Sequence, residues 1–337
     1  MLKSMVSVGV KVINLMKSKV KIIANDASSR TFSRVLINKR YKILVSSKTN
    51  KYSNLIAYTA INKFLRKKKF LAPKLFSHDY TRGTILIEDF GDISFHRILN
   101  KEKKKFDIYK KLINLLLDIQ KIKPEKKIKN IINNSHFVEV YSLKHLVKES
   151  DLFFDWYLPL IFKKTRVLNI KKKTKKVLSQ IYKKLYFPNR YFVHRDYHTQ
   201  NLMKVGKKIG ILDSQDALIG NPAYDLASLI DDVRIETSKK LKNNIYNYYI
   251  NNTSSNLKKN KNFFINDFNI LSVQRSLKII GIFSRLYKRD KKDKYLKMIP
   301  YTWKLLELRM KSKTFRELRN ILDFNISKKT RDFFLYK

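Results

Sequence analysis

The chain has 337 residues, of which 44% are hydrophobic and 12% aromatic, which is enough for two lobes with a real core. It contains no cysteine, so disulfide scaffolds, thiol nucleophiles and cysteine-bound zinc are excluded. No apolar run approaches the ~18 residues of a membrane helix, so we expect no membrane span and a cytoplasmic protein.

The formal net charge of +47 is the most unusual feature of the composition. Such a charge attracts nucleic acids and anionic lipids. The lysines are nevertheless spread over the whole chain and accompany abundant Asn, Ile, Tyr and Phe, which is the bias expected of an AT-rich genome. We therefore interpret the charge as a solvated surface and expect no specific nucleic acid partner, although a basic field also favours a polyanionic substrate.

Short strands dominate the first quarter of the chain, after an N-terminal extension over residues 1–20 that we expect to be disordered. The strands are rich in β-branched residues, and one segment has the apolar spacing of a helix. The predicted strands cover 21–24, 34–37, 41–45 and 84–88, and the predicted helix covers 52–68. This pattern predicts a small, β-rich N-lobe over residues 21–91.

From residue 92 to the C-terminus at 337, helical patterns prevail. Helices are predicted at 109–122, 152–162, 174–185 and 268–287, and a polar surface loop at 251–261. A strand at 190–193 and a hairpin within 201–213, turned at Gly206, interrupt them. The predicted fold class is therefore α+β, with a larger, mainly helical C-lobe that carries the hairpin.

His194, Arg195, Asp196 and Asn201 follow the H-R-D-x-x-x-x-N form of a kinase catalytic loop. In this spacing, an aspartate accepts the proton of an acceptor hydroxyl, and an amide five residues later reaches a magnesium ion. The alternative is a polar loop without catalytic function.

Asp213 lies twelve residues after Asn201, at the end of an apolar strand. A carboxylate there is costly unless it is paired or binds a metal. The predicted hairpin returns Asp213 close to Asn201, so the two can share a Mg²⁺ that bridges the phosphates of ATP. We therefore predict Asp196 as the base and Asn201 and Asp213 as the metal ligands.

The segments VHRDYHTQNLM and ILDSQDALIGNPAYDLASLIDD resemble the aminoglycoside phosphotransferase and choline kinase superfamily. The resemblance implies a bilobal, protein-kinase-like fold and phosphorylation of a hydroxyl on a small molecule. It implies the same roles for the three residues above, a bracing role for Asp225 beneath the catalytic loop, and structural support from His194.

SQDALIGNPAYDLASL is similar, more narrowly, to the corresponding motif of bacterial cell-wall amino-sugar kinases, which phosphorylate the anomeric hydroxyl of N-acetylmuramate or N-acetylglucosamine. The segments 151–159 and 274–286 support this subgroup. On the second segment, Gln274, Lys278, Gly281 and Arg285 have the spacing of one helix face, and Arg285 or Arg275 can pair with the carboxylate of a muramate. The alternative is a solvated helix face in a very basic protein. The candidate substrate-binding residues are Asp155, Trp156, His198, Gln215, Asp216, Arg275, Lys278 and Arg285.

The nucleotide end departs from the superfamily pattern. The polar loop that should cover the phosphates has no glycine, so we expect hydroxyl and backbone groups of Ser28 and Ser29 and the charge of Arg30 to bind phosphate instead. The usual ion pair between a strand lysine and a helix glutamate is absent, and Lys42 and Lys48 stay open as substitutes. The strand at 84–88 leads into a segment that resembles the inter-lobe hinge, where backbone groups of Glu88, Asp89 and Phe90 would bind adenine.

Two alternatives to an amino-sugar kinase stay open. One is a kinase of an amino alcohol or an aminoglycoside; 27 acidic against 74 basic residues disfavour a polycationic substrate. The other is a pseudokinase whose basic surface contacts RNA or a protein, suggested by the missing ion pair.

A further departure is Ser214, which follows Asp213 where the superfamily usually has an aromatic residue.

Overall fold

The computed structural model describes residues 21–24, 30–47, 52–130 and 135–332, and these belong to two compact units. The first unit contains the chain up to residue 98 together with 125–138 and 199–217. The second unit contains 99–124, 139–198 and 218–337. Two later segments of the chain therefore return to the N-terminal unit.

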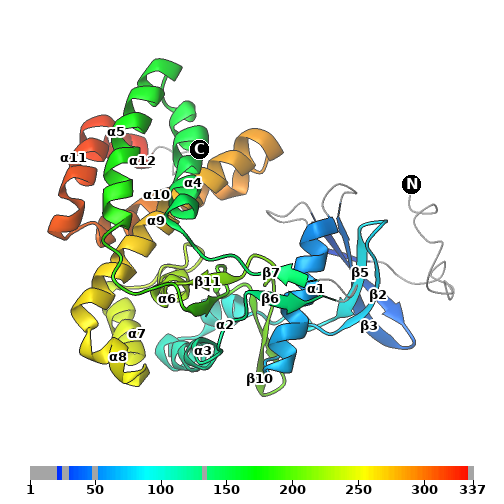
Figure 1. The fold of residues 1–337 in the computed structure, drawn as a ribbon. Helices are drawn as coiled ribbons and strands as arrows, with labels where there is room; N and C mark the ends of the chain where they lie inside the picture. Colours follow the sequence, from blue (N-terminus) through cyan, green and yellow to red (C-terminus); the bar gives the residue numbers. More distant parts are fainter. Residues whose placement is uncertain (1–20, 25–29, 48–51, 131–134, 333–337) are drawn as a thin grey trace. The chain divides into compact units, whose positions relative to one another are not determined.

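The first unit is built on an antiparallel sheet of five strands in the order β1-β2-β3-β5-β4 (Figure 1). The strands are β1 (Lys21–Ala24), β2 (Arg30–Ile37), β3 (Arg40–Ser47), β4 (Leu75–Asp79) and β5 (Thr84–Glu88). Side chains alternate between the two faces of a strand, and in β3 the buried positions are Ile43, Val45 and Ser47. The strand β4 was not predicted, because its exposed and half-buried residues give no strong pattern.

Helix α1 (Tyr52–Lys67) packs against the buried face of this sheet. Its Leu55 and Tyr58 join a cluster with the buried side chains of β3 and β5. The predicted helix at 52–68 is confirmed to within one residue.

The hairpin of β9 (Leu202–Val205) and β10 (Lys208–Ile211) belongs to the first unit. Gly206 has φ +57°, which suits the first position of the two-residue turn that joins the strands. Isolated bridges pair Leu71 with Gly210 and Ser94 with Met203. These bridges tie the hairpin to the N-terminal part of the chain. A small ladder of β6 (Lys127–Lys129) and β7 (Ser135–Phe137) completes the unit.

The second unit is mainly helical and is organised around the 30-residue helix α9 (Figure 1). Both faces of α9 are largely buried, and it packs against α4, α6, α10 and a π-helical turn, η3 (Phe153–Tyr157). Strands β8 (Tyr191–Val193) and β11 (Leu218–Gly220) pair within the same unit. The helices are α2 (Phe95–Lys101), which contains the boundary of the units, α3 (Lys105–Gln120), α4 (Leu143–Leu152), α5 (Lys164–Tyr182), α6 (Ala223–Ile230), α7 (Lys239–Asn252), α8 (Ser255–Lys259), α9 (Lys261–Asp290), α10 (Ile299–Arg309), α11 (Arg316–Asn325) and α12 (Lys328–Asp332).

The predicted surface loop at 251–261 is wrong. Helix α8 lies within it, and α9 begins at its last residue. The polar composition concealed this helix, whose Leu257 is buried and anchors it to the core.

A buried ionic network links α4, α9 and the loop after β8 inside the second unit. The Glu149 carboxylate accepts hydrogen bonds from Tyr141, Arg195, Gln274 (2.9 Å) and Lys278 (3.2 Å). Burial alone would raise the pKa of Glu149, but the charges of Lys278 and Arg195 outweigh it and lower this pKa to about 2. We call this set the Glu149 network.

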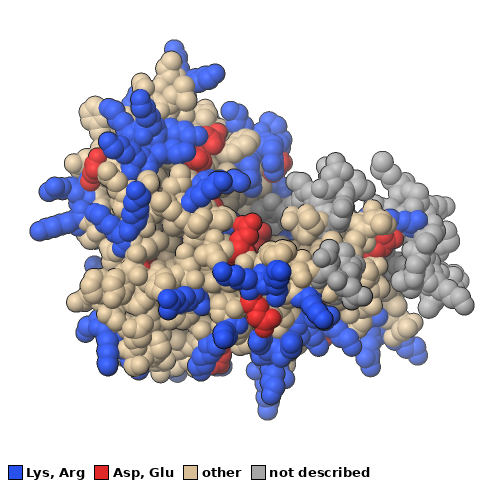
Figure 2. All heavy atoms as spheres, in the orientation of Figure 1, with Lys and Arg blue, Asp and Glu red and all other residues tan. Residues whose placement is uncertain are grey.

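Lysine and arginine side chains are spread over the face shown in Figure 2 and are not confined to one area of it. Among the described residues, no helix is both long and apolar enough to cross a membrane.

Gly281 of α9 predicts a test of the packing inside the second unit. A Cβ atom at this position would lie 2.3 Å from the carbonyl carbon of Leu152, where α4 meets η3. Because backbone cannot move aside cheaply, we expect Gly281→Ala to lower the free energy of unfolding by about 2 kcal/mol. Urea denaturation measures this, with the exposed Asn262→Ala as a control that changes little; equal stability of both variants would contradict the packing.

Glu149 predicts a pH-dependent contribution to stability. Its pKa is lowered from an ordinary 4.5 to about 2 in the folded protein, so the ionised form is favoured by folding. We expect Glu149→Gln to lower the free energy of unfolding by about 3 kcal/mol at neutral pH, because two buried cations lose their counter-charge. That difference should be complete above pH 4.5 and shrink as the pH falls toward 2.

The measurement is urea denaturation of the wild type and Glu149→Gln at a series of pH values down to about 3. A difference in stability that does not depend on pH would show that the carboxylate contributes through packing rather than through its charge.

Candidate active site

The hairpin of β9 and β10 brings Asn201 beside the segment that carries Asp213. The backbone N–H of Leu212 donates a 2.8 Å hydrogen bond to the carbonyl oxygen of Asn201, at the open end of the hairpin. Asp213 follows at once and has φ +61°, a left-handed conformation that is unusual for a residue other than glycine. Strain of this kind is often found where a side chain must be aimed in a particular direction. The predicted hairpin is confirmed, and it brings the two proposed metal ligands together.

The side chain of Arg30, the first residue of β2, contacts the residues that follow the hairpin. Its guanidinium forms an ion pair with the Asp213 carboxylate at 2.6 Å and donates a 3.0 Å hydrogen bond to Gln215. The side chain of Arg30 is 6% exposed, whereas that of Asp213 is 34% exposed. Asp213 is therefore partly exposed to solvent, and the guanidinium of Arg30 that pairs with it is buried.

Ser214 occupies the position where an aromatic residue was expected. It is buried, and its hydroxyl donates a 2.7 Å hydrogen bond to Asn62 of α1. At this position, a hydrogen bond joins the segment after the hairpin to α1, where an aromatic side chain would pack in related kinases.

Two oxygen-bearing side chains fit a magnesium ion. Magnesium prefers oxygen ligands and is usually held by one or two protein groups together with substrate phosphates. Asn201 and Asp213 supply an amide and a carboxylate of this kind. Within the described ranges, no group of three or more His, Asp or Glu side chains gathers where it could hold a metal ion by itself.

The predicted adenine-binding segment follows β5. The backbone N–H of Glu88 donates to Lys74, and the Asp89 carboxylate is bonded to Arg34 at 2.5 and 2.9 Å. The ring of Phe90 is buried against Gly210, where any Cβ atom would lie 2.6 Å from it. Adenine binding by this segment stays a prediction, and Ser28 and Ser29 lie outside the described residues.

Asp196 lies in the second unit, in the loop that follows β8, and is half-buried. Burial would raise the pKa of Asp196, but the charges of Lys278, Arg275 and Arg195 outweigh it and hold this pKa well below its usual range. The carboxylate is therefore ionised at any physiological pH.

Asp225 of α6 fixes the backbone of this loop. Its two carboxylate oxygens accept hydrogen bonds from the N–H groups of His194 (2.7 Å) and Arg195 (2.9 Å). Arg195 has φ +75°, so the loop needs such support. Burial raises the pKa of Asp225 to about 6, although the His194 charge and the two backbone bonds oppose the rise. This geometry fits the bracing role expected of Asp225.

His198 is buried in the same loop. Burial and the charge of Arg234 lower its pKa to about 3. The imidazole is therefore neutral near pH 7, which favours a structural or orienting role over proton donation.

Some of the candidate substrate-binding residues are bonded to groups around Asp196 and Glu149, and others are exposed. Arg275 donates a 3.0 Å hydrogen bond to the carbonyl oxygen of Arg195, and Lys278 belongs to the Glu149 network. Asp155, by contrast, is exposed and paired with Lys171 of α5 at 2.5 Å.

The remaining candidates differ in unit and burial. Gln215 donates a 2.9 Å hydrogen bond to Asp216, and both belong to the first unit. Trp156 is half-buried. The Nε atom of Arg285 is buried, and the described residues offer it no hydrogen-bond partner. A role in substrate binding stays a prediction for all eight.

Glu149 is the important residue that sequence reasoning missed. It pairs with Arg195 and Lys278, two cations whose charges lower the pKa of Asp196. Nothing in the sequence KESD marks this carboxylate as buried, because its neighbours along α4 are mostly polar.

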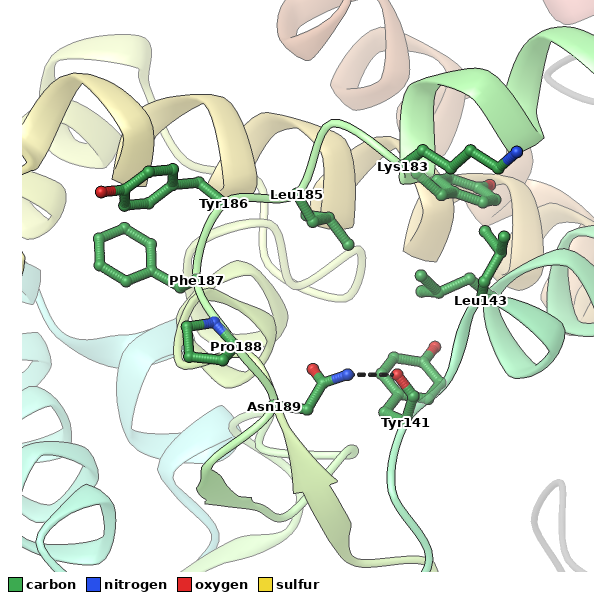
Figure 3. A pocket seen from close by; sticks show the side chains of 10 residues that line it. Tyr141, Leu143, Lys183, Leu185, Tyr186, Phe187, Pro188 and Asn189 are labelled. Carbon is green, nitrogen blue, oxygen red and sulfur yellow. Dashed lines mark hydrogen bonds between the residues drawn. The ribbon is translucent and has the colours of Figure 1, made fainter.

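A pocket of about 260 Å³ lies in the second unit, and its lining includes Tyr141, which also belongs to the Glu149 network (Figure 3). Asn189 points toward Tyr141 and donates a 2.8 Å hydrogen bond to its carbonyl oxygen. The lining is largely aromatic and aliphatic, and Asp196 is not part of it.

Two proteins with named activities are similar to the chain over most of its length. The N-acetylmuramate/N-acetylglucosamine kinase of Caulobacter vibrioides is 25% identical over 283 residues, which cover 82% of this chain and 76% of that protein. The protein of the same name from Neisseria meningitidis serogroup B is 26% identical over 302 residues, which cover 88% and 86%.

A solved structure shares the fold. The ADP-bound aminoglycoside phosphotransferase APH(2'')-Ib superposes with a TM-score of 0.58 at 14% identity and covers 86% of this chain and 92% of its own. The predicted kinase-like α+β fold is thereby confirmed.

The model of the phosphotransferase enzyme family matches residues 19–256, a span that includes the strands of the first unit, the loop of Asp196 and the hairpin that ends at Asp213. The chain belongs to the phosphotransferase enzyme family.

Proposed function

We propose that the protein transfers the γ-phosphoryl group of ATP to the anomeric hydroxyl of N-acetylmuramate or N-acetylglucosamine. The observation that carries the proposal is the hairpin that holds the backbone of Asn201 beside Leu212, next to Asp213. Two oxygen-bearing side chains that lie close together would suit a phosphate-bound magnesium. The activity named for the two relatives supports the choice of acceptor.

In the proposed reaction, the bond between the γ-phosphorus and the leaving oxygen of ADP breaks, and a bond to the sugar oxygen forms. Magnesium held by Asn201 and Asp213 would offset the negative charge of the phosphates. The protein's own contribution is mainly positioning and electrostatic stabilisation, as in other phosphoryl transfers.

Asp196 is the proposed partner of the acceptor hydroxyl. Because cations keep its pKa low, Asp196 is a weak base that stays ionised. It can accept a hydrogen bond from the hydroxyl and orient its oxygen, and it receives the proton only when the new P–O bond has begun to form.

A weak base favours an acidic acceptor. An anomeric hydroxyl is more acidic than an ordinary alcohol, because the ring oxygen withdraws electron density from the same carbon. The low pKa of Asp196 is therefore compatible with an anomeric acceptor and less suited to the plain alcohol of choline or ethanolamine.

The acceptor's carboxylate is a second point of recognition in the proposal. Arg275 and Lys278 are engaged with Arg195 and Glu149, whereas the Nε atom of Arg285 has no partner among the described residues. Burial lowers the pKa of Arg285, and the neighbouring charge of Arg289 lowers it further, so a bound carboxylate would relieve an unfavourable charge.

Replacement of Asp196 by Asn tests the catalytic assignment. The amide keeps the shape of the side chain but cannot accept the hydroxyl proton, so we expect kcat to fall by about 10³-fold while nucleotide affinity changes little. ADP release is measured over N-acetylmuramate, N-acetylglucosamine, choline, ethanolamine and aminoglycosides. Asp118→Asn, an exposed aspartate of α3, is the matched control, and an Asp196→Asn variant as active as this control would refute the assignment.

Arg285→Gln tests the recognition of the acidic acceptor. Loss of a charge-assisted hydrogen bond should raise KM for N-acetylmuramate by about tenfold and leave KM for N-acetylglucosamine unchanged, because the latter has no carboxylate. The exposed Arg289→Gln, one turn further along α9, serves as the control for a general change in charge. Equal effects on both sugars would contradict a carboxylate-binding role for Arg285.

A further inference from the structure

Kinases usually hold the nucleotide phosphates with a strand lysine paired with a helix glutamate, and of the two candidate substitutes for that lysine, Lys48 lies outside the described residues. Lys42 is the candidate on β3. It shares a face of the strand with Leu44 and Ser46, because alternate residues point to opposite sides. Its Nζ atom lies 4.2 Å from the ring centre of Phe76 on β4, a side chain that is itself exposed. Lys42 therefore stands on the opposite side of β3 from Ile43, Val45 and Ser47, the residues that face α1.

Arg30 stands on the face that Lys42 does not reach. In the ladder of β2 and β3, Arg30 is directly opposite Ser47, and directly opposite residues of an antiparallel pair point to the same side. Ser47 is buried on the α1 side of the sheet. Arg30 thus presents its guanidinium toward α1 from the strand next to β3.

Two aromatic rings support the guanidinium of Arg30. Its central carbon lies 5.8 Å from the ring centre of Tyr58 on α1 and 5.6 Å from that of Phe32. Burial raises the pKa of Tyr58 to about 12, so the phenol is neutral. A planar guanidinium stacks on such rings, whereas the usual lysine needs a glutamate. This explains how α1 can lack an acidic residue at this place.

We propose that Arg30 binds the phosphates of the nucleotide from β2, in place of the lysine that other kinases carry on β3. The proposal rests on the proposed function. Arg30 contacts Asp213 at 2.6 Å, and Asp213 is a residue that would hold magnesium beside the phosphates in the proposed reaction. A guanidinium that touches this carboxylate is therefore within reach of the same phosphates. Its fork of donors already spans Asp213 and Gln215, and such a fork matches the oxygens of a phosphate group.

Asp213 and the phosphates compete for the same donors of Arg30. If Asp213 held magnesium when the nucleotide binds, the metal would offset the charge of Asp213, and the guanidinium of Arg30 would be available to the phosphates. Binding of nucleotide without magnesium has to break the ion pair instead. Arg30 would in this way link phosphate binding to metal binding.

The first experiment compares Arg30→Gln with Lys42→Gln, two variants that each remove one cation from adjacent strands. Calorimetry measures the Kd of ADP, of a non-hydrolysable ATP analogue and of adenosine, all with magnesium. We expect Arg30→Gln to weaken binding of both phosphorylated ligands by about tenfold or more and to leave adenosine unchanged. Lys42→Gln should bind all three like the wild type. Wild-type affinities in Arg30→Gln, or a loss in Lys42→Gln instead, would overturn the proposal.

The Arg30→Lys variant is the control for the case in which Arg30→Gln does not fold. This variant keeps the buried charge but loses the planar fork, so we expect a native circular dichroism spectrum and an affinity for the ATP analogue several-fold weaker than that of the wild type. Unchanged affinity in Arg30→Lys together with an unfolded Arg30→Gln would mean that Arg30 acts only as a structural residue.

A double-mutant cycle tests the competition with Asp213. In magnesium-free buffer, Asp213→Asn should tighten ADP binding when Arg30 is present, and by a smaller factor in the Arg30→Gln background. Equal factors in both backgrounds would contradict the coupling. If the wild type binds no nucleotide at all, the proposed function and the role of Arg30 fail together. If the wild type binds and transfers phosphate while the Arg30 variants do the same, the role of Arg30 alone fails.

Discussion

The carboxylate of Glu149 is the charge that holds the polar side chains around Asp196 together in the second unit. It accepts hydrogen bonds from α9, from Tyr141 and from the arginine next to Asp196, all in the interior of the helical unit. Without it, Arg195 and Lys278 would lose the carboxylate with which they form ion pairs, and removal of one partner of a buried ion pair is costly. Because the same cations lower the pKa of Asp196, the network also sets the protonation state of the proposed catalytic residue.

In the first unit, a single ion pair, between Arg30 and Asp213, balances a carboxylate at the edge of the interior. Asp213 stands in a left-handed conformation at the end of the hairpin, and Arg30 neutralises it from β2. Ser214 and Asn62 join the hairpin to α1 directly below. Where related kinases usually have an aromatic residue after this aspartate, the chain has the hydrogen bond between Ser214 and Asn62. In our proposal, Arg30, whose guanidinium lies over the ring of Tyr58, takes the place of the lysine and its glutamate.

Local patterns predicted much of this arrangement. The β-branched run of β3, the helical spacing of α1 and the glycine turn at Gly206 all carry their structure in the local sequence, and the structure has them nearly where they were expected. The spacing of Asp196, Asn201 and Asp213 identified the reaction class because each residue type has a distinct task in phosphoryl transfer.

Long-range contacts could not be predicted in this way. The register that places Arg30 opposite Ser47 depends on how two strands pair, and the bridges of Leu71 and Ser94 to the hairpin join segments more than a hundred residues apart. Glu149 and the short helix α8 were missed for a related reason, since a polar residue in a polar stretch gives no sign of burial.

Phosphorus NMR of the product tests the central claim most directly. After incubation of the protein with ATP, magnesium and N-acetylmuramate, the account predicts a new phosphate resonance coupled to the single proton on the anomeric carbon. A resonance coupled to two protons on one carbon would place the phosphate on the primary hydroxyl instead. The absence of any sugar phosphate would contradict the account altogether.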